Sequence, residues 1–350
     1  MVLTIAAAIF VFGLLVLVHE LGHFVTAKLT GMRVDEFAIG FGPKIVSQQY
    51  GETAYSIRAI PLGGFNDIAG MDPEDNDAGE RGYCRKSIPR RMIVILAGSA
   101  MNLILPVFIF FGVFVATGVG EPNPDPVFGQ VLSGHPAAEA GLQSGDRVIA
   151  VNGTPVTTWK EFTTALQQNV SEEETPAPVT LDFTRDGEQM TATMTPTIEK
   201  TNGRAVIGVM SDTITTYPGV IDCAVLAVQK TVGIIGMMLY ELYQIILKLS
   251  GADLAGPIGV AQMAGQVAEM GFVPLLNFTA FLSLNLGIIN LFPIPALDGG
   301  HFASLCIEGV KGSPLSPKTM YYAQRVGIAL LLLLMIFATK NDIMRVFFGG

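Results

Sequence analysis

The sequence predicts a multi-pass α-helical membrane protein with about four transmembrane helices, a membrane-associated β-hairpin and an inserted extracytoplasmic α/β domain. Three observations support this prediction. First, 50% of the 350 residues are hydrophobic and only 15% are charged, and the mean hydropathy is +0.49, which is too apolar for an ordinary water-soluble protein. Second, several apolar runs are long enough to cross a bilayer. Third, charge is distributed very unevenly between the segments that join them.

The apolar runs define the expected spans, since a helix needs about 20 such residues to cross the hydrocarbon core. They are Val2–Val18, which continues to Val25, then Met92–Val119, Asn277–Leu297 and Val326–Thr339. No Lys or Arg precedes the first run, and no small-residue cleavage site follows it. We therefore expect a retained first span and not a signal peptide.

The charge distribution predicts the orientation. Residues 121–217 hold five basic and thirteen acidic residues, a net charge of −8 within a formal total of −9. Basic residues gather instead in the 27–91 loop, against the first two spans, at Lys28, Arg33, Arg81, Arg85, Lys86, Arg90 and Arg91. Because cytoplasmic loops carry such an excess, we expect the 27–91 loop in the cytoplasm and the acidic segment outside.

Residues 34–65 have the composition of strands. The segments "KIVSQQ" and "TAYSIRAI" flank Tyr50-Gly51-Glu52, which is typical of a hairpin turn. "PLGGF" (61–65) follows, and its Gly63 and Gly64 allow another backbone to approach closely.

Residues 127–210 predict a small soluble α/β domain. It contains strand-like segments, a helical "TTWKEFTTALQQ", and a hairpin with its turn at Asp186-Gly187. After it, residues 219–249 are helical and apolar but interrupted by charges, and we favour a helix on the membrane surface over a fifth span. "GADLAGPIGVAQMAG" (251–265) is so rich in Gly and Pro that we expect a loop there.

The first span contains the motif HExxH, formed by His19, Glu20 and His23. Residues four apart share one helix face, so both imidazoles can reach one metal ion, and Glu20 can act as general base on a water molecule there. Ionisable residues at bilayer depth cost roughly 2.5–3.5 kcal/mol each on insertion scales. Two structural core histidines are the alternative, and this cost argues against it.

A catalytic zinc has three protein ligands and an open position. Asp298 in "NLFPIPALDGGH" (290–301) is the favoured third ligand, because Pro293 and Pro295 must unwind the end of the third span. Gly299 and Gly300 then permit close approach. His301 is the competing candidate.

These motifs resemble the site-2 protease family, the intramembrane zinc metalloproteases, and in particular its bacterial regulated-proteolysis branch with a single PDZ domain. The resemblance rests on HExxH, on NxxPxPxLDGG, and on "HPAAEAGLQSGDRVIAVNGTPV" (135–156), which matches the PDZ pattern. Further matches are "GFGP" (40–43), "IPLGGF" (60–65), "AGSAMN" (97–102) and "GPIGVAQ" (256–262).

The resemblance implies one Zn²⁺ per chain, held by His19, His23 and Asp298 with Glu20 as general base, in the bacterial inner membrane. It also implies that Asn285 and Asn290 hold substrate beside the metal; interhelical hydrogen bonds are their alternative role. Ser99 stands where the family usually has proline, a departure that we expect to touch no ligand.

The resemblance implies cleavage of single-span membrane proteins, such as pre-cleaved anti-sigma factors or remnant signal peptides. An extended substrate could pair with the edge of the 44–60 hairpin beside Gly63 and Gly64, although a hairpin that only covers the metal site is the alternative. The PDZ domain would control substrate access and bind exposed C-termini. The lipid bilayer is the other expected partner, and no nucleic acid is expected.

The expected organisation has four parts: a catalytic membrane part (1–119), the PDZ domain (122–212), an interfacial helix with a Gly/Pro loop (219–265) and a second catalytic membrane part (270–350). Two other functions remain open. A non-catalytic PDZ-bearing membrane scaffold gives no reason for HExxH. A transporter does not need HExxH, and the sequence shows no inverted repeat.

Overall fold

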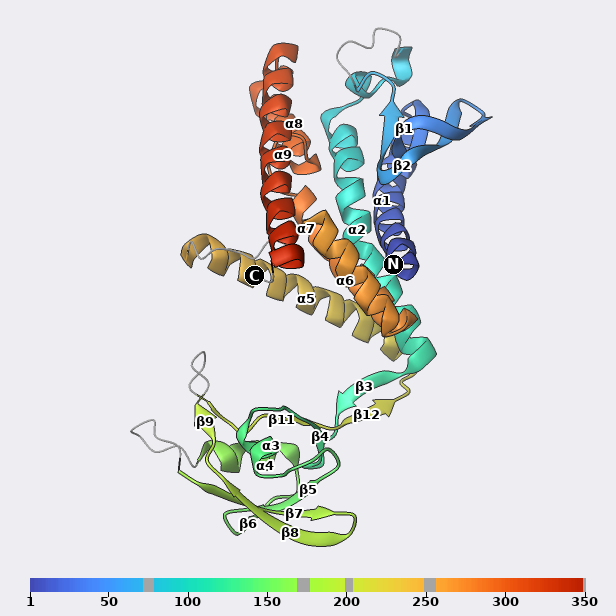
Figure 1. Ribbon diagram of the computed structural model, residues 1–350. Helices are drawn as coiled ribbons and strands as arrows, with labels where there is room; N and C mark the ends of the chain where they lie inside the picture. Colours follow the sequence, from blue (N-terminus) through green and yellow to red (C-terminus); the bar gives the residue numbers. More distant parts are fainter. Residues whose placement is uncertain (72–78, 169–176, 199–203, 249–255, 349–350) are drawn as a thin grey trace. The chain divides into compact units, whose positions relative to one another are not determined.

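The computed structural model describes residues 1–71, 79–168, 177–198, 204–248 and 256–348 (Figure 1). The chain divides into two compact units. Unit 1 contains Met1–Phe114 and Val220–Gly350, and unit 2 contains Val115–Gly219. The second unit is therefore an insertion between two halves of the first. Each unit is described by itself.

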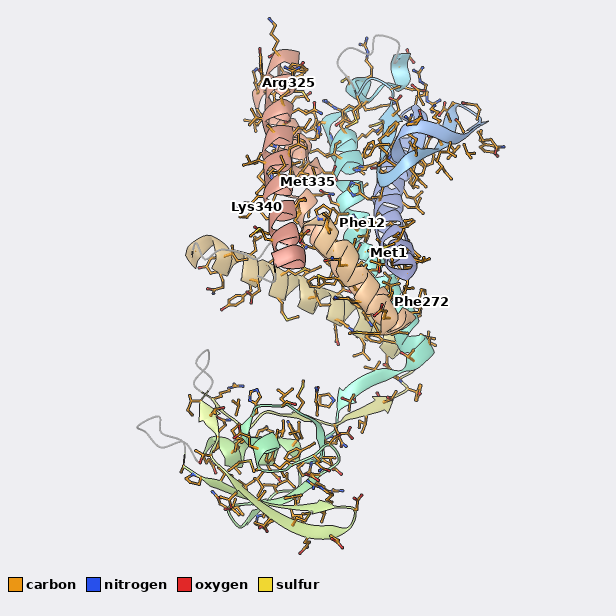
Figure 2. All side chains as sticks on the ribbon, viewed as in Figure 1. Met1, Phe12, Phe272, Arg325, Met335 and Lys340 are labelled. Carbon is orange, nitrogen blue, oxygen red and sulfur yellow. The ribbon has the colours of Figure 1, made fainter. Side chains whose placement is uncertain are left out.

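Unit 1 is mainly helical. Its described helices are α1 (Val2–Leu29), α2 (Ile88–Thr117), α5 (Val220–Lys248), α6 (Pro257–Glu269), α7 (Phe272–Asn290), α8 (Asp298–Lys311) and α9 (Pro317–Phe348). Many apolar side chains on them are exposed; one is Met335, which Figure 2 labels on α9. Exposed apolar faces of this kind are expected where lipid, and not water, surrounds the helices.

Five of the described helices are long and apolar enough to cross a membrane: α1, α2, α5 over Val220–Ile245, α7, and α9 over Lys318–Asp342. We expected about four spans and a surface helix at 219–249. The candidate span beyond those four is therefore α5. One of its charges, Lys230, lies over the rings of Phe110 and Phe114 on α2, at 4.4 and 5.3 Å from their centroids. Such cation–π contacts lower the cost of a charge in an apolar helix.

The expectation that residues 251–265 form a loop is wrong where the structure describes them, because Pro257–Glu269 is helical. Pro257 occupies the first turn, where a missing N–H costs nothing. The carboxylate of Asp342 on α9 accepts hydrogen bonds from the backbone N–H of Gly256 and Gly259, over 3.1 and 2.8 Å. One of the glycines, Gly265, allows α6 to pack closely against α1. A Cβ on Gly265 would lie 2.6 Å from Thr4 Oγ1 of α1.

A hairpin of β1 (Val34–Tyr50) and β2 (Thr53–Ile68) follows α1, as predicted. Tyr50 pairs with Thr53 across the turn. The first part of β1 has two neighbours, because its register pairs Ala38 with both Ser56 and Phe65. The last part of β2, Gly64–Ile68, therefore forms an edge of this sheet. Two short 3-10 turns, Gly79–Arg81 and Tyr83–Arg85, lead to α2.

Unit 2 contains a four-stranded sheet in the order β6-β5-β7-β8. Its strands are β5 (Arg147–Val151), β6 (Thr154–Pro155), β7 (Val179–Arg185) and β8 (Glu188–Met194). The predicted turn at Asp186-Gly187 is confirmed, with φ values of 52° and 87°, as a two-residue hairpin turn requires. The core includes Phe128, Phe162, Leu181 and Ile207.

Two helices and three short strand pairs complete unit 2. The helices are α3 (Pro136–Glu139) and α4 (Trp159–Gln167). The pairs are β4 (Phe128–Val131) with β11 (Val209–Ser211), β9 (Thr197–Ile198) with β10 (Ala205–Val206), and β3 (Val119–Pro122) with β12 (Thr213–Thr216). The β3–β12 pair brings the two ends of the insertion together, since Pro122 lies opposite Thr213.

Candidate metal centre

The two histidines of HExxH lie one above the other on α1. Their Nε2 atoms are 3.3 Å apart and their rings meet edge to face. A spacing of four residues in a helix produces this arrangement. Both side chains are mostly buried, with 14% of His19 and 11% of His23 exposed.

Asp298 reaches the same point from the far end of the chain. Helix α7 ends at Asn290, and the backbone is not helical again until Asp298 begins α8. Ala296 in this segment has a φ of 82°, and a Cβ on Gly299 would lie 2.3 Å from Leu291 O. The segment between α7 and α8 is therefore unwound, as expected from its prolines, and Gly299 lies close to the backbone of Leu291, as expected from the glycines.

The three side chains present a donor set that fits zinc. Asp298 Oδ2 lies 3.6 Å from the Nε2 atoms of both His19 and His23, and the donor atoms of the cluster all lie within 4.8 Å of one another. Bonds of about 2.0–2.1 Å to a tetrahedral zinc place neighbouring donors about 3.4 Å apart. Two imidazole nitrogens and one carboxylate oxygen at these separations can therefore share one ion.

His301, the competing third ligand, does not belong to this cluster. It lies in the first turn of α8 and lines a small cavity of about 60 Å³ with Ser304 and Met320. Among the described residues, the possible metal ligands that come together are His19, His23 and Asp298.

Glu20 faces the β-hairpin. Its carboxylate Oε2 accepts a hydrogen bond from Asn66 Nδ2 over 2.7 Å, and the same nitrogen donates to the backbone carbonyl of Glu20 over 2.8 Å. A Cβ on Gly64 would lie 3.0 Å from Glu20 Cγ and from Val16 Cγ1. Gly64 therefore lets β2 pass directly against the HExxH face of α1.

Helix α2 contacts all three members of the cluster. His23 Nδ1 lies 2.8 Å from Val94 O, Asn102 Nδ2 lies 3.3 Å from His19 Nδ1, and Ser99 Oγ donates to Asp298 Oδ2 over 2.9 Å. The expectation that Ser99 touches no ligand candidate is therefore wrong. Gly98 lets the helices approach, since a Cβ there would lie 2.2 Å from His23 Nε2.

The contact at His23 Nδ1 sets the tautomer of that histidine. His23 Nδ1 can only donate to a carbonyl, which leaves Nε2 unprotonated for a metal. For His19 the same state requires Nδ1–H to donate to Asn102 Oδ1. Turning the Asn102 amide achieves this and gives a partner to Oδ1, which is buried without one among the described residues.

Sequence reasoning missed Asn66, Val94 and Asn102. The available signal was that Asn102 is a polar side chain inside an apolar span, and that Asn66 directly follows "IPLGGF". A backbone carbonyl such as Val94 O leaves no trace in the sequence.

The expected substrate-binding residues make no hydrogen bond to the His19–His23–Asp298 cluster among the residues that the structure describes. Asn285 is exposed on α7 and Asn290 is half-buried at its last position. Neither side chain makes a hydrogen bond to any residue that the structure describes. Gly63 has a φ of 98°, and a Cβ there would lie 2.2 Å from the ring of Phe41, so only glycine fits at this position.

Ion pairs hold the elements that carry the cluster. Arg91 on α2 binds Glu308 on α8 through two hydrogen bonds of 3.0 and 2.5 Å. Glu52 in the hairpin turn binds Arg81 and Lys28. The hydrogen bond from Arg81, and to a smaller extent that from Lys28, lowers the pKa of Glu52 to about 2. The Glu52 carboxylate is therefore charged at neutral pH.

Unit 2 contains a separate groove of about 840 Å³ between α4 and the segment 204–209. Its lining includes three basic or titratable side chains, His135, Lys160 and Arg204, in a segment that is otherwise acidic. At one end Gln167 of α4 bonds to both the N–H and the carbonyl of Ala205, over 2.9 and 2.8 Å.

The chain is similar to known proteins over nearly its whole length. Residues 7–334 match the model of the family described as peptidase family M50. The chain is 32% identical to the "Regulator of sigma-W protease RasP" of Bacillus subtilis, over 98% of this chain and 99% of that protein. It is 30% identical to the "Regulator of sigma-E protease RseP" of Salmonella typhimurium, over 97% of this chain and 98% of that protein.

Similarity to solved structures covers a smaller share of the chain. One such structure is the PDZ domain of an SdrC-like protein from Listeria monocytogenes, which is 20% identical and has a TM-score of 0.22. The match covers 26% of this chain and 90% of that domain.

Proposed function

Because the chain belongs to peptidase family M50, the site-2 protease family of zinc metalloproteases, we propose that it cuts single-span membrane proteins within their transmembrane segments. The observation that carries this proposal is the convergence of His19, His23 and Asp298 at one point between spans. The sigma-factor regulators among its relatives support substrates such as pre-cleaved anti-sigma factors or remnant signal peptides.

One zinc ion per chain would be held by His19 Nε2, His23 Nε2 and one oxygen of Asp298. When bound, zinc supplies a Lewis acid that polarises the scissile carbonyl and makes water acidic enough to attack near neutral pH. Glu20 is the general base: its carboxylate takes the proton of the attacking water and returns it to the leaving amide nitrogen. The hydrogen bond from Asn66 holds that carboxylate in one orientation.

The substrate must be extended to expose a peptide bond, because the carbonyls of a helix are already hydrogen-bonded. The edge of the hairpin at Gly64–Ile68 supports strand addition, since this edge passes directly against Glu20. Gly63 and Gly64 would bind the substrate backbone, and Asn285 and Asn290 would hold the chain on the α7 side. A hairpin that only covers the metal is the alternative.

The orientation follows from charge. The basic 27–91 loop and the active end of α1 would face the cytoplasm, with the PDZ domain (122–212) on the outside of the bacterial inner membrane. The catalytic parts would be 1–119 and 270–350, and the intervening 219–265 part would contribute α5, as a fifth span or a surface helix, together with α6.

The inserted domain would control access of substrates. Its groove between α4 and 204–209 is suited to an exposed C-terminus, because the basic side chains of Lys160 and Arg204 line it and can pair with a carboxylate. A newly trimmed membrane protein offers such a terminus, whereas an intact one does not.

The test is the position of the cut. Purified protein is incubated with a single-span substrate trimmed outside the membrane, and the products are mapped by mass spectrometry. Cleavage within the apolar segment, lost with a chelator and restored by zinc, is expected. Intact substrate after zinc loading would favour a non-catalytic PDZ-bearing scaffold.

A further inference from the structure

We propose that Ser99 is a positioning residue of the metal centre, whose hydroxyl holds the carboxylate of Asp298 in the orientation that zinc requires. This inference rests on the ligand set proposed above. It adds a residue that sequence reasoning had placed out of contact with every ligand.

The contact joins two elements that are distant in the chain. Ser99 is fully buried in α2, and its Oγ donates to Asp298 Oδ2 over 2.9 Å, across 199 residues of sequence. A buried serine inside a helix commonly bonds back to a carbonyl of the preceding turn. Here the hydroxyl is directed to another helix instead.

The accepting atom is the one that faces the histidines. The same Oδ2 lies 3.6 Å from the Nε2 atoms of both His19 and His23. A carboxylate oxygen has two lone-pair positions, so Oδ2 can accept the Ser99 hydrogen bond with one and coordinate a metal with the other. Among the described residues, the hydroxyl group that donates a hydrogen bond to this carboxylate is that of Ser99.

Asp298 needs such a partner more than the histidines do. It follows a segment without helical hydrogen bonds, and it begins a helix whose N-cap residue, Leu297, makes no side-chain cap. Each histidine, in contrast, extends from within the continuous helix α1 and has its own partner on α2, Val94 O or the Asn102 amide.

Helix α2 therefore orients all three ligands. Its contacts come from Val94, Ser99 and Asn102, which all lie within about two and a half turns of the helix. Partners of this kind commonly change metal affinity by about 10–100-fold when they are removed. Ser99→Ala should thus loosen zinc while leaving the ligands themselves in place.

The matched control is Ser283 on α7. It is also fully buried, and it also donates its hydroxyl to α2, but to the backbone carbonyl of Asn102 over 2.7 Å and not to a ligand side chain. Ser283→Ala removes the same group at the same burial.

The experiment measures zinc affinity of the full-length purified protein by competition with a chelator, with no activity readout. Ser99→Ala should raise the zinc dissociation constant about tenfold or more, Ser283→Ala should change it less than about twofold, and Ser99→Thr, which keeps a hydroxyl, should recover most of the loss. Wild-type affinity in folded Ser99→Ala would overturn the inference.

A double-mutant cycle separates positioning from folding. If Ser99 acts through Asp298, then Ser99→Ala should cause no further loss of affinity in an Asp298→Ala background. Additive losses would assign Ser99 to the packing of α2 and overturn the inference. Unchanged affinity in Asp298→Ala alone would instead refute the proposed ligand set, so the two failures are distinguishable.

Discussion

Asn66 Nδ2 donates to two oxygens of Glu20, the carboxylate Oε2 over 2.7 Å and the backbone carbonyl over 2.8 Å. The β-hairpin is thereby attached to the HExxH turn of α1 at the residue proposed as general base. We therefore propose that the hairpin contributes to catalysis by orienting the Glu20 carboxylate.

The first prediction concerns Asn66. Asn66→Ala should lower kcat on the order of tenfold with zinc still bound, because the Glu20 carboxylate loses its fixed orientation. Gln49→Ala is the control, since the Gln49 amide is exposed on the same hairpin and bonds only to Gly51 O among the described residues. Steady-state cleavage of a fluorescent transmembrane peptide gives kcat. Equal values for Asn66→Ala and Gln49→Ala would refute the role.

The second prediction concerns the third ligand. Asp298→Ala should lower the zinc content of the purified protein well below that of the wild type, because two imidazoles alone make an incomplete zinc site. His301→Ala should retain zinc, since His301 faces the cavity beside Ser304 and Met320. Metal content is measured by plasma emission spectrometry. The opposite pattern would make His301 the ligand.

The third prediction concerns orientation. Gly187→Cys, at the exposed hairpin turn of unit 2, should react with a membrane-impermeant maleimide added to intact cells. The natural Cys84 is an internal control, because it is exposed in the 27–91 loop and should react only after lysis. Labelling is read separately at each site by peptide mass spectrometry. Labelling of Cys84 in intact cells, with no labelling at the thiol introduced by Gly187→Cys, would reverse the proposed orientation.

The fourth prediction concerns the inserted domain, which holds none of the proposed ligands. Pro122 and Thr213 are cross-strand partners, so residues 123–212 can be replaced by a two-residue Asn-Gly turn that retains the β3–β12 pair. This variant should still cut a pre-trimmed substrate and should also cut some untrimmed substrate. Complete loss of activity on the pre-trimmed form, in folded and zinc-loaded protein, would place the domain within the catalytic machinery.

Much of the metal centre could be predicted from the sequence because its signals are local. The spacing of His19 and His23 determines a shared helix face, and Pro293 and Pro295 determine an unwound segment before Asp298. The hairpin turn at residues 51–52 and the turn at Asp186-Gly187 are likewise set by neighbouring residues.

The remaining features depend on tertiary contacts, which local patterns do not contain. Helix α6 forms despite its glycines because Asp342, 86 residues away from Gly256, caps its first turn. Ser99 contacts Asp298 because of how α2 is rotated against α8. The length of α5 and its packing also depend on such contacts, since the charge of Lys230 lies over aromatic rings on α2.

The most direct test of the account compares the wild type with Glu20→Gln, measuring zinc content and cleavage of the same single-span substrate in parallel. The amide cannot take a proton from water, whereas the ligand atoms of His19, His23 and Asp298 are unchanged. We predict the same zinc content in both proteins and a loss of cleavage on the order of 10²–10⁴-fold in Glu20→Gln. Equal cleavage by the two zinc-loaded proteins would contradict the account.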